Sequence, residues 1–225
     1  MIAPLAKFID CSVLRLVYAI LPQSLWREAN ERDVKLEQAV QFLNGPDFIP
    51  AESQSAQLYA QAIAEIRSLV GWLLAEGCPA VALGGGSLGA YLAGLTAWRD
   101  ARLNSVVMTM PLARQSNLLS QVGRRGRELT LRRRAACEEL DRTPLNLGTS
   151  QPAISREKVL LIEGMHDLMV SSGPGEIWQS WGQPEIWKLP HGHISSALIM
   201  PGLTGRVLRW LTPRLDVPDI SATTK

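Results

Sequence analysis

The chain has 225 residues, enough for one domain with a sizeable hydrophobic core. Hydrophobic residues make up 46% and charged residues 20%, as in ordinary globular proteins, and the net charge of +2 is too small to indicate a nucleic-acid or anionic-membrane partner. The three cysteines (Cys11, Cys78 and Cys137) are widely spaced, so they predict neither a disulfide framework nor a zinc site, and a reducing, cytoplasmic setting is the simplest expectation.

The first 50 residues carry a weak pattern. Cys11–Ile20 could form a buried strand or a short helix, and Trp26–Leu43 has the scattered apolar positions of a charged helix. The apolar run Val13–Leu21 is interrupted by Arg15, and it is shorter than the roughly 20 apolar residues that a membrane span needs. Asp10 precedes this run and no clear cleavage site follows it. We therefore expect neither a membrane span nor a secretory signal here.

A clear helical pattern begins at Ser53. Its apolar face comprises Leu58, Ala62, Ile66, Leu69, Val70 and Leu73. Ser53 or Ser55 can cap the start of this helix, and Gly77 with Pro79 ends it. The next segment, Ala80–Leu83, is short and apolar, which predicts a buried strand.

The rest of the chain alternates predicted strands and helices. The further strands are Ser105–Met110, Lys158–Glu163 and Glu185–Leu189. The helices run from after Gly89 to about Trp98 and over Leu112–Leu140, Glu176–Trp181 and Ile194–Leu211. A break near Gly123 and Gly126 is open for the second of these, and the last is expected to kink near Pro201 and Gly202. This alternation predicts an α/β fold, a mostly parallel sheet with helices on both faces, as one domain over residues 1–225 with a loose tail at 213–225.

Residues Gly85-Gly86-Ser87-Leu88-Gly89 fit the G-x-S-x-G pattern of a nucleophile elbow. In such an elbow the serine occupies a strained strand-to-helix turn, which needs small neighbours: Gly85 and Gly89 meet that need, and Gly86 adds room. The helix N-terminus favours developing negative charge, and the Leu88 N–H would be an oxyanion donor. A plain glycine-rich turn or a phosphate-binding loop is the alternative, but there is no Walker lysine and no suitably spaced acid.

An acid and then a base are expected after the serine in the chain. Asp167 follows the strand Lys158–Glu163 at the carboxyl end, where sites of α/β sheets gather, and Glu163 itself is a second candidate acid. His193 lies directly before the last helix and is the candidate base, while His191 comes earlier in the same loop. A metal site from these two histidines lacks a third ligand at suitable spacing, so we expect no metal and no other cofactor.

These residue types predict nucleophilic catalysis on a small acyl substrate. His193 would take the proton from Ser87 and later give it to the leaving group. Asp167 would fix the imidazole tautomer and stabilise the imidazolium. Ser87 would form a covalent acyl-enzyme that water then hydrolyses.

On these motifs the chain resembles the α/β-hydrolase superfamily. More narrowly, it looks like the branch that includes α/β-hydrolase domain-containing protein 18 and its bacterial relatives. The resemblance covers roughly residues 44–212 and rests on Asn44-Gly-Pro-Asp-Phe-Ile-Pro50, the Gln61–Trp72 helix, Gly85-Gly-Ser-Leu-Gly89, Ile162-Glu-Gly-Met-His-Asp167 and Gly192-His-Ile-Ser195. It implies a serine hydrolase with a Ser-His-Asp triad.

Residues 1–43 do not match this family and form an atypical N-terminal segment. Similar proteins carry several strands before the elbow strand, and the loop after one of them supplies a second oxyanion N–H. No His-Gly or Gly-Gly loop after a strand is found here, so the second donor stays unassigned. An uncovered edge on the elbow strand could pair with the N-terminal segment or with a second copy, which leaves a homodimer open, and a truncated relative is a further alternative.

Two other clusters have open interpretations. Six arginines form a basic cluster opposed only by Glu128: Arg124, Arg125, Arg127, Arg132, Arg133 and Arg134. This cluster is either a solvated helix face or a docking patch for an acidic substrate, a lipid headgroup or a partner. No aromatic residues interleave with it, so nucleic acid is not an expected partner. The tryptophans Trp178, Trp181 and Trp187 are expected in the core or in a wall of the site.

The sequence thus leaves two functions from different classes. The first is a serine hydrolase that cleaves an ester or related acyl bond. The second is an α/β-hydrolase-fold protein of weak or no activity that acts as a binding module. The Ser-Asp-His set favours the first, and the unmatched N-terminal segment favours the second.

Overall fold

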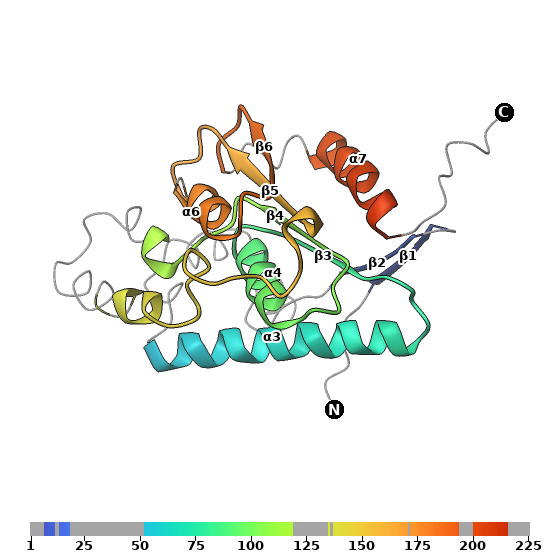
Figure 1. Ribbon diagram of the computed structural model, residues 1–225, viewed down its shortest axis with the longest axis horizontal. Coiled ribbons are helices and arrows are strands. Elements are labelled where there is room, and N and C mark those ends of the chain that lie inside the picture. The colour runs from blue at the N-terminus through green and yellow to red at the C-terminus, as the bar shows by residue number, and fades with distance from the viewer. Residues whose placement is uncertain are drawn as a thin grey trace, which may run out of the picture. The chain divides into compact units, whose positions relative to one another are not determined.

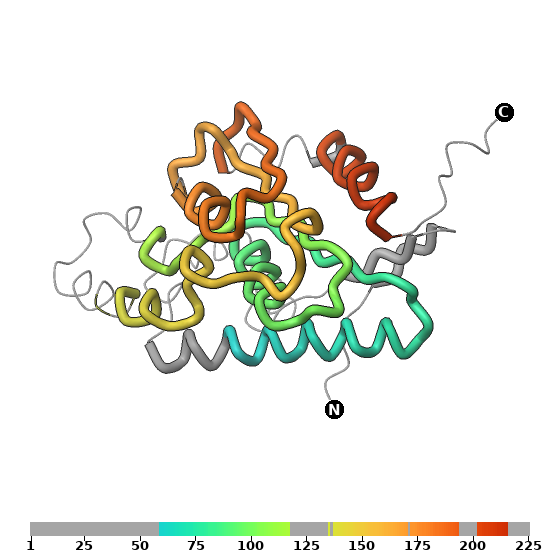
Figure 2. The backbone as a smooth tube through the Cα atoms, viewed as in Figure 1, coloured from blue at the N-terminus to red at the C-terminus, as the bar shows by residue number. Residues whose placement is uncertain are grey.

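The computed structural model of this protein describes residues 7–11, 14–18, 52–118, 135, 137–170, 172–193 and 200–215. Contacts within the chain divide it into two compact units, Met1–Ile66 and Arg67–Lys225. The boundary falls inside helix α3, Glu52–Ala75. Figures 1 and 2 follow the second unit from the green elbow strand to the red terminal helix.

The first unit contains a β-hairpin. Strands β1, Lys7–Cys11, and β2, Leu14–Tyr18, pair antiparallel, with Cys11 opposite Leu14. Within the predicted element at Cys11–Ile20, Leu14–Tyr18 form a strand and Cys11 ends the preceding strand, while residues 12, 13, 19 and 20 lie outside the described residues. The predicted helix at Trp26–Leu43 and the segment 44–50 lie outside the described residues.

Helix α3 begins earlier than its sequence signals suggested. It starts at Glu52, so Ser53 and Ser55 lie inside the helix and the prediction that one of them caps it was wrong. The predicted end is confirmed at Gly77, which takes a left-handed φ of 85°. There the N–H of Gly77 donates to the Leu74 carbonyl and the next N–H donates to Leu73, the pattern of a glycine-terminated helix.

The second unit is built on a four-stranded parallel sheet in the order β3-β4-β5-β6 (Figure 1). The strands are β3 Ala82–Gly86, β4 Ser105–Thr109, β5 Val159–Gly164 and β6 Glu185–Leu189, and every neighbouring pair is parallel. This confirms the predicted fold class. The strand β3 starts at Ala82, two residues later than predicted, and continues three residues beyond Leu83 through the glycines to Gly86.

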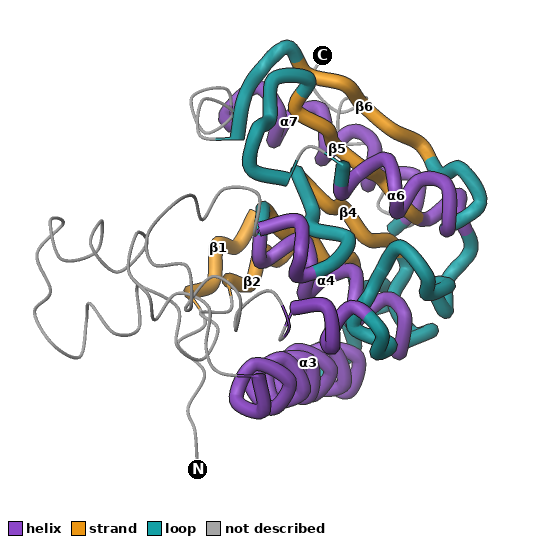
Figure 3. The backbone as a smooth tube through the Cα atoms, turned by 90° about the vertical axis from the view of Figure 1, so that its left-hand side faces the viewer, coloured by secondary structure: helices purple, strands orange, loops and turns teal. Residues whose placement is uncertain are grey.

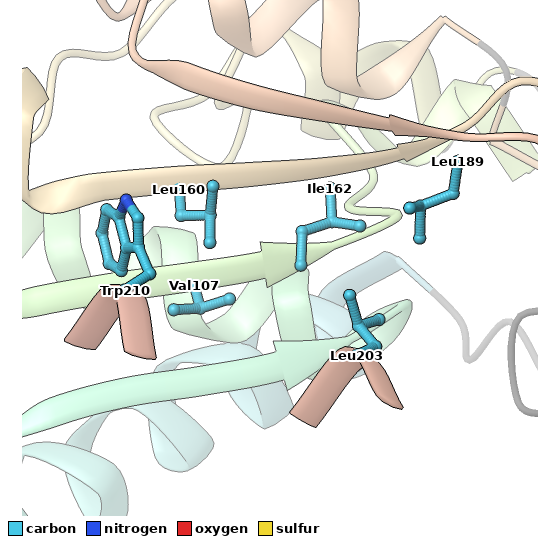
Figure 4. Close-up of a cluster of buried hydrophobic side chains, with 6 residues drawn as sticks. All are labelled: Val107, Leu160, Ile162, Leu189, Leu203 and Trp210. Carbon is cyan, nitrogen blue, oxygen red and sulfur yellow. The ribbon is translucent and has the colours of Figure 1, made fainter. Parts of the chain in front are cut away.

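Helices cover both faces of this sheet (Figure 3). Helix α7, Met200–Leu211, places Leu203 and Trp210 against a cluster from the strands comprising Val107, Leu160, Ile162 and Leu189 (Figure 4). The other face presents Met108, whose sulfur lies close to Gly94 on helix α4, Leu88–Arg99. Neighbouring residues of β4 thus point to opposite helices, as the two-residue period of a strand requires.

The predicted helix at Leu112–Leu140 differs from the structure in its first residues. Leu112–Arg114 is a loop and Gln115–Leu118 is a short 3-10 helix, so the predicted helix at Leu112–Leu140 was wrong at its start. The Asn117 side chain explains this, because its Oδ1 accepts the N–H groups of Ala113 and Arg114 that a helix would direct elsewhere. Residues 119–134, with the arginine cluster, lie outside the described residues, while 137–141 are helical.

The C-terminal helix is described as α7 over Met200–Leu211, which agrees with the predicted end at Leu211. The predicted start at Ile194, and with it the kink expected near Pro201 and Gly202, depends on residues that the structure does not describe. Residues 194–199 lie outside the described residues. The tail begins later than predicted, since Thr212–Arg214 form a 3-10 helix and Leu215 is buried.

The remaining second-unit elements fix the packing around the sheet. Helix α6 spans Gly173–Ser180 and begins three residues before the predicted Glu176. Trp181 is buried and donates its indole N–H to the Leu147 carbonyl at 3.0 Å, which confirms its expected packing role. No helix in the described part of the chain is long and apolar enough to cross a membrane.

The crowding at Gly94 makes a testable prediction about the sheet packing. A methyl group there would lie 2.6 Å from Leu147 Cδ1 and 2.9 Å from Met108 Sδ, whereas Gly175 on α6 has open space. We expect Gly94→Ala to lower the free energy of unfolding by about 1 kcal/mol, since overpacking outweighs the gain in helix propensity. Gly175→Ala, the matched control, should raise it by up to about 1 kcal/mol. Denaturant unfolding of both variants measures this, and changes in the same direction would contradict it.

Candidate active site

The turn from β3 into α4 presents the hydroxyl of Ser87. Ser87 has φ 52° and ψ −117°, a backbone conformation that residues other than glycine rarely adopt. Its N–H donates to the Thr109 carbonyl of β4 at 2.9 Å, and its own carbonyl accepts the Tyr91 N–H at 3.0 Å. Ser87 is the N-cap of α4, yet its side chain makes no capping bond. The hydroxyl is therefore available to another partner.

Among the elbow glycines, the steric requirement falls on Gly85. A Cβ on Gly85 would collide with the Gly89 carbonyl group and lie 2.7 Å from the backbone nitrogen of Ala90. Gly86 and Gly89 have no atom within 4 Å of a Cβ added to them. The expectation that Gly89 must also be small was wrong: its backbone, not its missing side chain, is what approaches β3.

The structure brings Ser87, His193 and Asp167 into one hydrogen-bonded chain. His193 Nε2 lies 2.9 Å from Ser87 Oγ, and His193 Nδ1 lies 2.7 Å from Asp167 Oδ2. An ionised carboxylate can only accept, so the ring donates from Nδ1 and is left with Nε2 to accept the serine proton. The side chains of His193 and Asp167 are 14% and 3% exposed, so the hydrogen bond between them is largely shielded from water.

Asp167 is held by four hydrogen-bonding groups. Its Oδ1 accepts the backbone N–H groups of Met169 at 2.7 Å and Val170 at 3.1 Å, while Oδ2 faces His193. Burial works to raise the pKa of Asp167, but the hydrogen bonds from His193, Val170 and Met169 outweigh it and hold that pKa below its usual value. Its own N–H donates to the Gly164 carbonyl at 3.0 Å. Asp167 is thus an ionised and oriented acceptor for the imidazole.

Backbone hydrogen bonds join the loop of the acid to the loop of the base. Beyond the β5–β6 ladder, the Met165 N–H donates to the Leu189 carbonyl at 2.8 Å and the His166 N–H donates to the His191 carbonyl at 3.1 Å. Gly164 sits at this junction, where an added Cβ would lie 2.7 Å from the His191 carbonyl oxygen and 3.3 Å from the Asp167 Cβ. The two loops therefore act as an extension of the sheet.

The other candidate residues have different surroundings. Glu163, the second candidate acid, forms an ion pair with Lys188 at 3.3 Å. His191, the second candidate base, contributes its backbone carbonyl to the loop junction. No group of three metal-ligating side chains occurs in the described part of the chain. The predicted donor Leu88 occupies the first position of α4, where the backbone N–H has no acceptor within the helix.

Comparison with known proteins begins with the sequence. No family model matches the chain. It is 32% identical over 142 residues to two uncharacterized proteins of Mycobacterium tuberculosis, MT2702 of strain CDC 1551 and Rv2627c of strain H37Rv. The alignment covers 60% of this chain and 33% of each relative, so the match spans about a third of the length of these curated relatives.

Comparison with solved structures identifies the fold. The esterase Pf2001 of Pyrococcus furiosus aligns with a TM-score of 0.51 at 16% identity, over 69% of this chain and 63% of that chain. An α/β-fold family hydrolase of Bacillus anthracis aligns with a TM-score of 0.48 at 11% identity, over 68% of this chain and 73% of that one. The chain has the α/β-hydrolase fold, as its parallel sheet and strand-turn-helix elbow indicate.

The elbow geometry predicts that substituting Gly85 slows the reaction of Ser87 and that substituting Gly89 does not. Gly85→Ala should reduce the rate at which Ser87 reacts with an electrophilic probe by at least about tenfold, because the turn must open to admit the methyl group. Gly89→Ala should leave the rate within about twofold, because its Cβ position is open. Probe-labelling rates on folded protein measure both effects. A larger loss for Gly89→Ala than for Gly85→Ala would contradict the elbow geometry.

The depressed pKa of Asp167 predicts a pH-dependent contribution to stability. A carboxylate with a lower pKa in the folded state stabilises the protein above its unfolded pKa of about 4, and this contribution is lost as the pH falls through the folded pKa. We expect Asp167→Asn to lower the free energy of unfolding by about 1.5 kcal/mol at pH 7, the lower end for hydrogen bonds to a charged group. Denaturant unfolding at pH 7 and below pH 4 should show that difference shrinking in acid. A difference that does not change with pH would argue against an ionised Asp167.

Proposed function

We propose that this chain is a serine hydrolase that cleaves an ester or a related acyl bond of a small molecule. The observation that carries the proposal is the continuous path from Ser87 Oγ through His193 to the ionised Asp167, at 2.9 and 2.7 Å. A base aligned on the hydroxyl and an acid aligned on that base form the arrangement that activates a serine as a nucleophile.

The proposed reaction proceeds in two halves. Ser87 Oγ attacks the acyl carbon while His193 Nε2 takes the hydroxyl proton, and Asp167 stabilises the imidazolium that forms. The negative oxygen of the tetrahedral intermediate faces the N-terminus of α4, where the Leu88 N–H is the assigned donor. His193 then returns the proton to the leaving oxygen, the ester bond breaks and the acyl group stays on Ser87.

The second half regenerates the serine. Water attacks the acyl carbon while His193 takes one of its protons, and the Ser87 oxygen leaves with that proton as the acid product departs. Every proton in this route passes through His193, so the proposed route calls for no metal or cofactor. The Pyrococcus furiosus relative in fold is an esterase, which is the class of reaction proposed here.

Several finer assignments belong to the same proposal. We place the chain in the branch of α/β-hydrolase domain-containing protein 18 and its bacterial relatives, on the motifs Gly85–Gly89 and Ile162–Asp167. A cytoplasmic setting rests on the widely spaced cysteines. A binding module of weak activity is the alternative that a failure of the labelling experiment would favour.

The proposal predicts that a fluorophosphonate labels Ser87. In that reaction the serine oxygen bonds to phosphorus, fluoride leaves and His193 receives the proton. Ser87→Ala should abolish labelling, and His193→Ala should slow it by about 10²–10⁴, the usual contribution of a general base. The readout is the second-order rate of labelling with an alkyl fluorophosphonate.

Matched variants separate the triad from its neighbours. Ser155→Ala removes an exposed serine elsewhere in the unit and should leave labelling unchanged. His191→Ala keeps the carbonyl that joins the two loops and should retain most of the rate, which distinguishes His193 from the second candidate base. Well-folded wild-type protein that reacts with no probe, or Ser87→Ala that still reacts, would overturn the proposal.

A further inference from the structure

Exposed apolar side chains gather on the loops that carry the nucleophile and the acid. The large hydrophobic residues exposed in the described part of the chain are Trp72, Leu88, Met165, Leu168 and Leu208. Leu88 directly follows Ser87, while Met165 and Leu168 flank Asp167 within two residues. Their exposed fractions are 40%, 61% and 76%. Single exposed apolar residues are ordinary, but a group of them beside one site marks a binding surface.

The loop of the nucleophile and the loop of the acid lie at the same edge of the sheet. Leu88 follows β3, Met165 and Leu168 follow β5, and the parallel strand β4 lies between these two strands. Neighbouring strands are about 4.8 Å apart, so the loops are separated by roughly 10 Å at their roots. His193 bridges them through its contacts with Ser87 and Asp167. We call Leu88, Met165 and Leu168 the apolar rim.

The loops of the triad contain no fixed charge that could bind a charged substrate. Residues 84–90, 164–170 and 189–193 include no lysine, arginine or glutamate. Their single acid is Asp167, which is buried and already accepts bonds from His193 and two backbone N–H groups. An anionic group of a substrate would lose its hydration here without gaining a cation from these loops, which is unfavourable.

We propose that the apolar rim binds an uncharged hydrocarbon chain on the substrate's acyl group, so that the enzyme prefers acyl groups of about six carbons to acetyl. This inference rests on the proposed function, since Ser87 must be the attacking group. The exposed methyl groups of Leu88 and Leu168 offer apolar area on the loop of the nucleophile and on the loop of the acid. The unbranched thioether of Met165 can adapt to chains of different shape.

The expected chain-length effect follows from the burial of methylene groups. A fully buried methylene would strengthen transition-state binding about fourfold, and a methylene on an open rim is only half removed from water, which gives about twofold each. Extending an alkyl fluorophosphonate from ethyl to hexyl adds four methylenes and should raise the labelling rate at Ser87 about 15-fold. This probe reports the preference without requiring the acyl-enzyme to turn over.

A substitution on the rim and a matched one elsewhere locate the effect. Leu168→Gln keeps the size of an exposed side chain but makes it polar, and it should lower the hexyl-to-ethyl rate ratio from about 15 to about 5. Leu208→Gln makes the same change on an exposed leucine of α7, outside the three loops, and should leave the ratio unchanged.

The outcomes of this experiment distinguish a failure of the inference alone from a failure of the proposed function. Equal ethyl and hexyl rates on Ser87 would overturn the apolar rim and leave the serine hydrolase standing. No labelling of folded protein by either probe would overturn both. A ratio that falls equally in both variants, or a Leu168→Gln variant that changes only the association state in gel filtration, would overturn the inference, and the second result would assign the rim to contact between copies.

Discussion

The site depends on how closely the β3 backbone approaches helix α4. The missing side chain of Gly85 lets the Gly89 carbonyl group reach the strand, and the chain can make that turn only with Ser87 at a positive φ. Such a conformation costs about 1–3 kcal/mol and persists only where the surroundings fix it. The N–H bond from Ser87 to Thr109 and the start of a buried helix do so here. In this conformation the hydroxyl does not cap α4 and instead lies within hydrogen-bonding distance of His193.

The sheet sets the spacing of the proposed acid and base, while backbone N–H groups of the acid's own loop hold its carboxylate. Asp167 and His193 follow adjacent parallel strands, and the β5–β6 hydrogen bonds continue past the strand ends to the His191 carbonyl. Because Gly164 lets these backbones touch, the spacing of acid and base is set by main-chain contacts. The nucleophile is tied to the same frame, since the Ser87 N–H is bonded to β4, which neighbours β5.

Much of this arrangement could be predicted from local sequence patterns. The strands β4 and β5 contain contiguous apolar runs, and the order of serine, acid and base selected Asp167 and His193. The extension of β3 to Gly86 could not be predicted, because glycine weakens a strand locally and its pairing with β4 holds it there. The Asn117 side chain replaces the predicted start of a helix by bonding to the nearby N–H groups of Ala113 and Arg114, and the loop junction at Gly164 joins segments distant in the sequence. Hydrophobic periodicity reveals neither contact.

The proposed activation of the nucleophile and the proposed stabilisation of the oxyanion can be tested separately. Ser87 and the two groups proposed to activate it, His193 and Asp167, lie in the second unit, and among the described residues β3 is hydrogen-bonded to β4 alone. One oxyanion donor is assigned, at Leu88, and losing a donor from such a site typically costs about 10²–10³ in rate. Labelling by a probe therefore tests whether the serine is activated. Turnover of a substrate, which passes through two tetrahedral intermediates, also tests how well the oxyanion is stabilised. If the serine is labelled but substrate turns over slowly, the missing rate enhancement is that of the second oxyanion donor, and the triad itself is intact.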